Sequence, residues 1–369
     1  MKKTFTKQAF AVLSCLAASI TVTAQDFNGM ENQRGYELSK KYGVVAKLQQ
    51  LKKPLISKKT DNEPKNLASG RLGIQSQNLI QPRNGQTTEY DFYGGVSERG
   101  NNVPFASVTD AQGNIYMTGG SSNLDQQSGD IYTIKISPTG VVLWEIREQA
   151  MIFAVDTGME IALAPDGNII VSGTHWNGTE TDIKTIKYNA ADGTQIWQNI
   201  YNGEAEGVDV PTAMVIDATG NIIVTGLTWS GNSIDYLTIK YGADGTQLWD
   251  VTSNPAGPDT WNEPRAVALD VNGNIIVSGY SPNPDGWLNY YTIKYNADGQ
   301  EQWNQSYHFE NLSDEEDPES QLIPTNSVPA AVIADSDGNI YVTGTFDTFS
   351  DRMGTIKYSA LGEEEWVEI

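Results

Sequence analysis

Runs of β-branched residues recur along the chain, and each run is preceded by a short polar turn. Residues at successive positions in a run are apolar, and the 3.6-residue spacing that would indicate a helix is missing. The five turn-and-run segments are DAQGNIYMTG (110–119), PDGNIIVSG (165–173), DATGNIIVTG (217–226), DVNGNIIVSG (270–279) and DSDGNIYVTG (335–344). Their Gly-Asn pairs lie 53, 54 or 65 residues apart, which indicates five copies of one unit about 53 residues long.

A second block follows each turn and contains a Thr-Ile-Lys sequence and a closing tryptophan. The repeated residues are Lys135, Lys187, Lys240, Lys294 and Lys357, and Trp144, Trp197, Trp249, Trp303 and Trp366. We expect the indoles to pack between neighbouring units and to donate their N–H groups there. In three copies an aspartate precedes the lysine by five residues (Asp130, Asp182 and Asp235), so we expect either a repeated ion pair or a lysine stem that covers apolar surface.

The third copy shows that each unit contains four strands. They are expected at Ala213 to Ile216, at Ile222 to Thr225, at Tyr236 to Tyr241, and around Leu248 and Trp249. A strand such as Ile222-Ile223-Val224 is apolar on both faces, so neighbouring sheets must cover both faces. Residues 89–369 are therefore predicted to be all-β: a β-propeller of four-stranded blades, with five repeats visible.

Several of these pieces resemble a known repeat family. Tyr90–Gly95 (YDFYGG), Ala106–Asp110 (ASVTD), Gly113–Gly119 (GNIYMTG) and Asp130–Lys135 (DIYTIK) resemble the seven-bladed β-propeller repeat (SBBP) family of bacterial exported proteins. The resemblance implies a secreted or cell-surface propeller, and for most such proteins no defined activity. The Ala-Asp-Gly-x-x-x-Trp pieces also look like quinoprotein propeller repeats.

The number of units departs from the family name, because five repeats are visible. Residues 88–95 match the fourth strand of a unit, yet Glu365-Trp366-Val367 already supplies a fourth strand to the last one. Both strands cannot occupy the same sheet edge. We therefore expect the sequence to be part of a longer protein with a larger propeller.

Residues 1–24 have the pattern of a secretory signal peptide. Three lysines are followed by the uncharged apolar run from Ala9 to Val22 and by the small-residue pattern Val22-Thr23-Ala24, which predicts a mature chain that begins at Gln25. An alternative makes Cys15, the single cysteine, a lipid attachment site. No other stretch is apolar enough to cross a bilayer, so we expect no membrane insertion after signal cleavage and a secreted or cell-surface location.

Charge divides the mature chain into two parts. Residues 25–88 carry 11 basic against 5 acidic residues and are predicted to be a polar, partly disordered leader or linker. Residues 89–369 carry 10 basic against 41 acidic residues. An acidic body repels phosphate backbones, which argues against nucleic acid as a partner.

No sequence pattern identifies a catalytic or metal site. Histidine occurs twice, and no Gly-x-Ser-x-Gly elbow, phosphate loop or dinucleotide fingerprint is present, so no metal, cofactor or catalytic residue is predicted. Asp335-Ser336-Asp337-Gly338-Asn339 has oxygen ligands at alternate positions, as calcium loops do. The other four copies keep only part of this pattern, and a turn stabilised by Asp and Asn explains it as well.

The connections between the second and third strands vary between copies and carry aromatic residues. The candidate ligand-binding residues are Trp176, Trp229, Trp287, Asn177, Asn232 and Asp285. In an up-and-down blade these loops emerge on the same face as the connections between units, one of which holds the acidic insertion Glu310–Gln321. We therefore predict a noncatalytic module that binds an extracellular glycan or protein on this face. The alternative is an extracellular enzyme, either a glycan hydrolase or lyase or a quinone-dependent oxidoreductase.

Overall fold

The computed structural model describes residues 102–123, 128–152, 154–311, 323–324, 326–347 and 352–369. The predicted signal peptide (1–24), the leader (25–88) and the start of the repeat region (89–101) lie outside the described residues. All regular structure in the described part is β-strand. None of it forms a helix long and apolar enough to span a membrane.

Twenty of the strands form five antiparallel four-stranded sheets, which we call blades 1 to 5. Blade 1 contains β1 (Asn102–Thr109), β2 (Ile115–Asn123), β3 (Ser128–Ile136) and β4 (Val142–Glu148). Blade 2 contains β5 (Thr157–Leu163), β6 (Ile169–Trp176), β7 (Thr181–Tyr188) and β8 (Gln195–Tyr201). Blade 3 contains β9 (Asp209–Ile216), β10 (Ile222–Trp229), β11 (Ile234–Tyr241) and β12 (Gln247–Ser253). Blade 4 contains β13 (Glu263–Leu269), β14 (Ile275–Pro282), β15 (Leu288–Tyr295) and β16 (Glu301–Tyr307). Blade 5 contains β19 (Asn326–Ala334), β20 (Ile340–Asp347), β21 (Arg352–Tyr358) and β22 (Glu364–Glu368).

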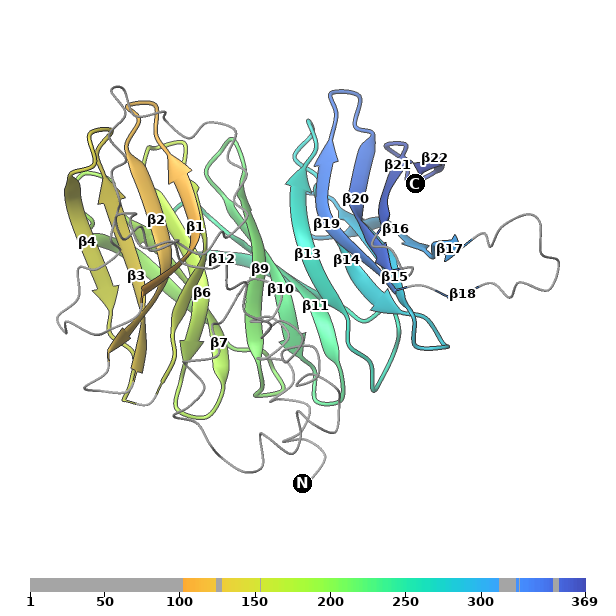
Figure 1. Ribbon diagram of the computed structural model, residues 1–369, viewed down its shortest axis with the longest axis horizontal. Coiled ribbons are helices and arrows are strands. Elements are labelled where there is room, and N and C mark those ends of the chain that lie inside the picture. Colours follow the sequence, from red (N-terminus) through yellow and green to blue (C-terminus); the bar gives the residue numbers. More distant parts are fainter. Residues whose placement is uncertain (1–101, 124–127, 153, 312–322, 325, 348–351) are drawn as a thin grey trace, which may run out of the picture. The chain divides into compact units, whose positions relative to one another are not determined.

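The five blades stand side by side with their first strands innermost. β1 packs against β5, β5 against β9, β9 against β13, and β13 against β19. In Figure 1 the outermost strands β4 and β22 accordingly lie at opposite sides of the view. The short pair β17 (Glu310–Asn311) and β18 (Ile323–Pro324) lies between blades 4 and 5 in the sequence. This arrangement is that of a β-propeller, as the repeat pattern predicted.

Hydrophobic clusters between successive blades hold the structure together. Ile222 and Val224 of β10 belong to the cluster between blades 2 and 3, whereas Ile223 belongs to the cluster between blades 3 and 4. Because successive side chains of a strand point to opposite faces, both faces of β10 are buried. The prediction that these runs are covered on both sides is confirmed, and all eight residues of β10 are buried.

The first strand of each blade contains a bulge opposite a glycine of the second strand. In blade 3 the register of β9 and β10 shifts between Thr225 and Gly226, after Pro211. A Cβ atom on Gly226 would lie 2.2 Å from the backbone oxygen of Val210. Glycine is therefore required at this position, and the residue that follows the proline is left unpaired at the bulge.

Three of the repeated lysines, Lys187, Lys240 and Lys294, pair with an aspartate, but with a different one from that predicted. Lys187 Nζ lies 2.7 Å from Asp166 Oδ2 and Lys294 Nζ lies 2.9 Å from Asp270 Oδ2, so the partner comes from the turn between the first and second strands. The expected pairing with Asp130, Asp182 and Asp235 is wrong. Side chains five positions apart on one strand point to opposite faces, so these aspartates cannot reach the lysines.

Candidate binding face

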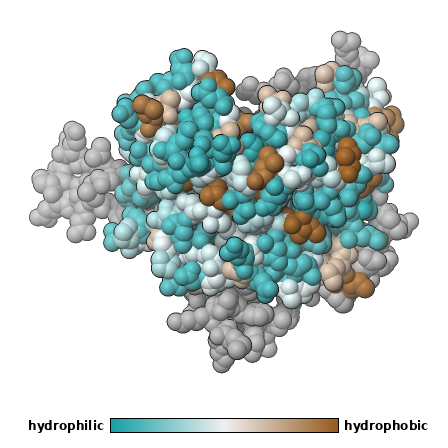
Figure 2. Space-filling view, turned by 180° about the vertical axis from the view of Figure 1, so that it is seen from behind, coloured by the Kyte–Doolittle hydropathy of each residue, from teal (hydrophilic) through white to brown (hydrophobic). Residues whose placement is uncertain are grey.

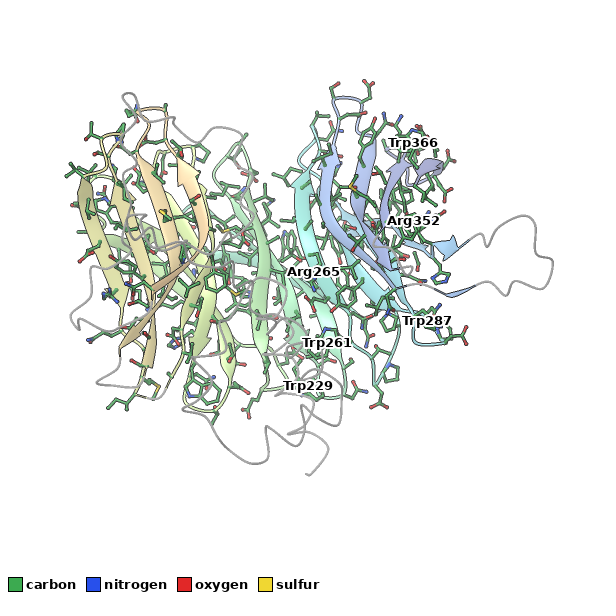
Figure 3. The ribbon with its side chains drawn as sticks, viewed as in Figure 1. Trp229, Trp261, Arg265, Trp287, Arg352 and Trp366 are labelled. Atoms are coloured by element: carbon green, nitrogen blue, oxygen red, sulfur yellow. The ribbon has the colours of Figure 1, made fainter. Side chains whose placement is uncertain are left out.

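One end of the blades carries the long connections, and we call it the loop-rich face. It holds the loops between second and third strands and the connections between blades, while the glycine turns between first and second strands and between third and fourth strands lie at the other end. Figure 3 shows Trp229, Trp261 and Trp287 toward this same lower end of the sheets. The antiparallel order within each blade thus gathers the predicted site residues on one face.

The three predicted tryptophans differ in exposure. Trp229, the last residue of β10, is only 7% exposed, and a Cβ atom on Gly207 would lie 2.3 Å from its ring carbon Cδ1. The indole therefore packs the incoming connection down, and the expectation of an exposed ring is not met there. Trp176 at the end of β6 and Trp287 before β15 are half-buried, so part of each side chain faces solvent.

The predicted polar residues also divide into two kinds. Asn177 Nδ2 donates to both carboxylate oxygens of Asp182, at 3.1 and 3.0 Å, and its Oδ1 accepts from the backbone N–H groups of Thr179 and Glu180. These bonds fix the β6–β7 loop and leave Asn177 little capacity for a ligand. Asn232 and Asp285 are exposed on their loops.

A buried cluster at the start of β13 was not anticipated from the sequence. The fully buried Glu263 accepts hydrogen bonds at Oε2 from Trp261 Nε1 at 3.0 Å and from the Tyr280 hydroxyl at 2.5 Å. Its Oε1 lies 2.8 Å from Arg265 Nε. Burial, together with the carboxylate of Glu263, raises the pKa of Tyr280.

The signal for this cluster was present in the alignment of the repeats. Glu263 precedes a proline at the position where blades 1, 3 and 5 have Val103, Val210 and Val328. Arg265 follows that proline at the bulge, where the register of β13 and β14 shifts. Blade 4 thus has a glutamate where these three copies have valine, and it has an arginine directly after the proline. This charged pair distinguishes blade 4 from those blades.

Buried acidic groups attach the incoming connection to blades 2 and 3. Asp156 Oδ2 lies 2.7 Å from His175 Nδ1, and its Oδ1 accepts from the backbone N–H of Trp176 at 2.8 Å. Asp209 Oδ2 accepts from the backbone N–H of Gly203 at 2.8 Å. Burial raises the pKa of Asp209 to about 7.

An apolar loop lies on the loop-rich face between β4 and β5. Met151, Ile152 and Val155 are 53%, 65% and 61% exposed. The loop is anchored, because the backbone N–H of Gly129 donates to Ala154 O at 2.8 Å, and Gly129 forms a parallel bridge with Val155. Solvent-exposed apolar side chains on an anchored loop are suited to contact with another molecule.

The rest of the surface is largely hydrophilic on the side that Figure 2 shows. Apolar patches appear there as separate spots on a polar background. An acidic, polar surface of this kind favours solubility. The few apolar groups exposed on it are therefore candidate sites of contact with another molecule.

The segment that resembled a calcium loop uses its oxygens locally. Asp335 Oδ1 accepts from the backbone N–H groups of Asp337 and Asn339, both at 2.9 Å, and Oδ2 accepts from Asn339 Nδ2 and the Tyr341 hydroxyl. The hydrogen bond from Asn339 leads the interactions that lower the pKa of Asp335. In the described part of the chain, no group of three His, Cys, Asp or Glu residues is arranged to hold a metal ion.

Comparison with known proteins gives a match to a propeller family and a match to a viral repeat protein. Residues 164–195 match the family described as "Domain of unknown function (DUF5122) beta-propeller". A WD repeat-containing protein of Acanthamoeba polyphaga mimivirus is 27% identical over 184 residues, which is 46% of this chain and 10% of the viral protein. The chain thus spans about a tenth of the length of that relative.

Solved structures resemble the chain at low identity. The polysaccharide lyase Uly1 is 11% identical with a TM-score of 0.48, and the alignment covers 78% of this chain and 76% of the lyase. The β-propeller domain of the trilobed protease from Pyrococcus furiosus is 7% identical with a TM-score of 0.35, over 72% of this chain and 92% of that domain. The narrower seven-bladed (SBBP) repeat family expected from the sequence is not confirmed. The match to a propeller family, together with five four-stranded sheets packed side by side, identifies the chain as a β-propeller protein.

Proposed function

We propose that this protein is a secreted or cell-surface, noncatalytic binding module that takes a protein ligand on its loop-rich face. The observation that carries the proposal is the exposure of Met151, Ile152 and Val155 on one anchored loop. Burying one such side chain in an interface contributes about 1.5–3 kcal/mol. Leaving three of them in water is therefore costly unless a partner covers them.

The acidic body suggests the chemistry of that partner. Residues 89–369 carry 41 acidic against 10 basic residues. A partner with an apolar centre and a basic rim would be attracted over a distance and would then bury the loop. Anionic partners would be repelled.

The titratable groups support binding without catalysis. A general acid needs a raised pKa together with access to the substrate. Asp209, whose pKa is raised to about 7, is almost completely buried. Glu160 is half-buried and also has its pKa raised to about 7, but burial is the one cause of the rise, so no charged group among the described residues stands by it as a catalytic partner.

A glycan ligand is the second candidate, favoured by the half-buried indoles of the same face. Trp176, Trp261 and Trp287 each keep part of the side chain in solvent, and the exposed Asn232 and Asp285 supply hydrogen-bonding groups on the same face. Aromatic faces stack on the apolar faces of sugar rings. Trp229 is not suited to this role because it is buried.

Binding to arrays of purified extracellular proteins and of glycans tests both candidates. We expect Ile152→Asp to weaken binding of a protein ligand about 10- to 100-fold, which corresponds to the loss of one buried aliphatic side chain. The matched control is Val271→Asp, since Val271 is equally exposed at 65% but lies in a glycine turn at the opposite end of the blades. Equal loss in both variants would refute the assignment of the face. Glycan binding that is lost in Trp287→Ala and kept in Ile152→Asp would instead support the second candidate.

A further inference from the structure

The four junctions between blades share one polar contact. At each junction the lysine Nζ and the tryptophan Nε1 of one blade both donate to the same backbone oxygen. This oxygen belongs to an alanine in the turn between the third and fourth strands of the next blade. The paired distances are 2.7 and 3.1 Å at Ala190, 3.1 and 3.2 Å at Ala243, 3.0 and 3.2 Å at Ala297, and 3.2 and 3.2 Å at Ala360. The acceptor turn is therefore a constant part of the docking contact.

The glycine of the same turn completes the contact. Gly193, Gly245, Gly299 and Gly362 all have positive φ, between 75° and 89°. A Cβ atom on any of them would lie 2.6–3.0 Å from the indole ring of the preceding blade. The indole thus lies flat against a turn that has room for it only when the residue is glycine.

Blade 5 carries the same donors on its forward side, the side on which each earlier blade meets its successor. Lys357 and Trp366 are paired across β21 and β22, as Lys294 and Trp303 are paired across β15 and β16. No described residue of a following blade meets them. Lys357 Nζ instead lies 2.6 Å from Glu365 Oε2, and Trp366 is 38% exposed.

The apolar positions of this forward side are exposed as well. Met353 is 71% exposed, although the residues at the same register, Ile131, Ile183 and Tyr290, are completely buried between blades. Ile333 on β19 is 62% exposed. Blade 5 therefore presents the apolar and polar halves of a blade junction together.

We propose that the forward side of blade 5 is a docking surface for a further four-stranded unit of the same repeat type. That unit presents a turn with a free backbone oxygen two or three residues before a glycine at positive φ. The oxygen accepts hydrogen bonds from Lys357 Nζ and Trp366 Nε1, and the glycine leaves space for the Trp366 indole. The surface is continuous with the junction of blades 4 and 5 and repeats its chemistry, so the occupant is defined by the four junctions already formed.

The first blade of a second copy has such a turn, with Pro138 two residues before Gly140 at φ of 85°, but not the accessible surface beside it. The equivalent rear side of blade 1 contains Tyr132, Ile134 and Ile136, which are 0–5% exposed in the structure. These side chains are therefore not accessible for contact with Met353 and Trp366 of a second copy.

An extended chain tests the proposal. A copy of residues 254–307, which comprise blade 4 and the connection that leads into it, is fused after Ile369, and methionine oxidation is mapped by mass spectrometry. We expect oxidation of Met353 to be lost in the extended chain, while Met151, which is exposed elsewhere, stays as reactive as before. Replacing the glycine of the added turn, the copy of Gly299, by valine should restore Met353 oxidation. The valine side chain would occupy the space of the Trp366 indole, so the added unit could not dock.

Three results would overturn the proposal. Met353 could remain fully reactive although hydrogen exchange shows the added unit folded. The added unit could stay unfolded, even though the same sequence folds against blade 3 in the native chain. In the unextended protein, Met353 could become protected as concentration rises, which would assign the surface to a second copy.

Discussion

Replacing Gly245 by alanine should weaken the junction of blades 2 and 3 far more than the same change in a glycine turn without a neighbour. Gly245 has φ of 89°, and a Cβ atom there would lie 2.7 Å from Cδ2 of Trp197. The ring must move, and with it the Trp197 Nε1 hydrogen bond to Ala243 O at 3.2 Å. The Lys187 bond to the same oxygen, at 3.1 Å, depends on the same turn.

Gly273 provides the matched control for this prediction. It has φ of 77°, and nothing lies within 4 Å of a Cβ atom built on it. Both substitutions therefore carry the cost of a left-handed backbone for an L-residue, about 1–2 kcal/mol. Gly245→Ala adds an overpacking cost of about 1–3 kcal/mol. The expected losses are thus about 1–2 kcal/mol for Gly273→Ala and about 2–5 kcal/mol for Gly245→Ala.

Urea unfolding followed by tryptophan emission measures the two free energies. Hydrogen exchange in β7 and β11 measures the junction itself, because repeat structures open in local units. Exchange in these strands should accelerate in Gly245→Ala and stay unchanged in Gly273→Ala. Equal destabilisation of the two variants would refute the inference that the indole needs the space left by the glycine.

Two further predictions concern buried charges. Lys294→Met should destabilise the protein by about 3–5 kcal/mol in urea unfolding, because it leaves buried Asp270 without its partner at 2.9 Å. The double variant Lys294→Met, Asp270→Asn should recover most of this loss, and a double variant no better than the single one would contradict the ion-pair explanation. Burial raises the pKa of Asp209 to about 7 from an ordinary value of 3.8. Between these two pH values the folded state therefore holds a proton on Asp209 that the unfolded state has lost. The contribution of Asp209 to stability should therefore decline as pH rises from about 4 to about 7. In Asp209→Asn this part of the decline, seen in melting temperatures at about pH 5 and pH 8, should disappear; an unchanged decline would show that Asp209 is not its source.

The sequence by itself determined the repeat, its four strands and the end at which the long connections gather. Gly245 and its equivalents could be recognised as turn residues because glycine takes positive φ without a Cβ clash. Runs such as Ile222-Ile223-Val224 could be read as buried on both faces because a solvent-facing strand would alternate. Periodic positions such as Trp197 could be assigned to docking, since a large indole in every copy needs a common surface to pack on.

Only the tertiary structure decided which side chains meet across different strands and blades. Lys187 pairs with Asp166 and not with Asp182, because the alternation of faces along a strand overrides closeness in sequence. Trp229 is buried under Gly207, whereas Trp287, in a similar loop, keeps part of its side chain in solvent. Exposure of this kind depends on the path of the adjoining connection, whose residues differ from copy to copy. The repeating part of the sequence carries no information about that path, and the candidate site lies in the part that does not repeat.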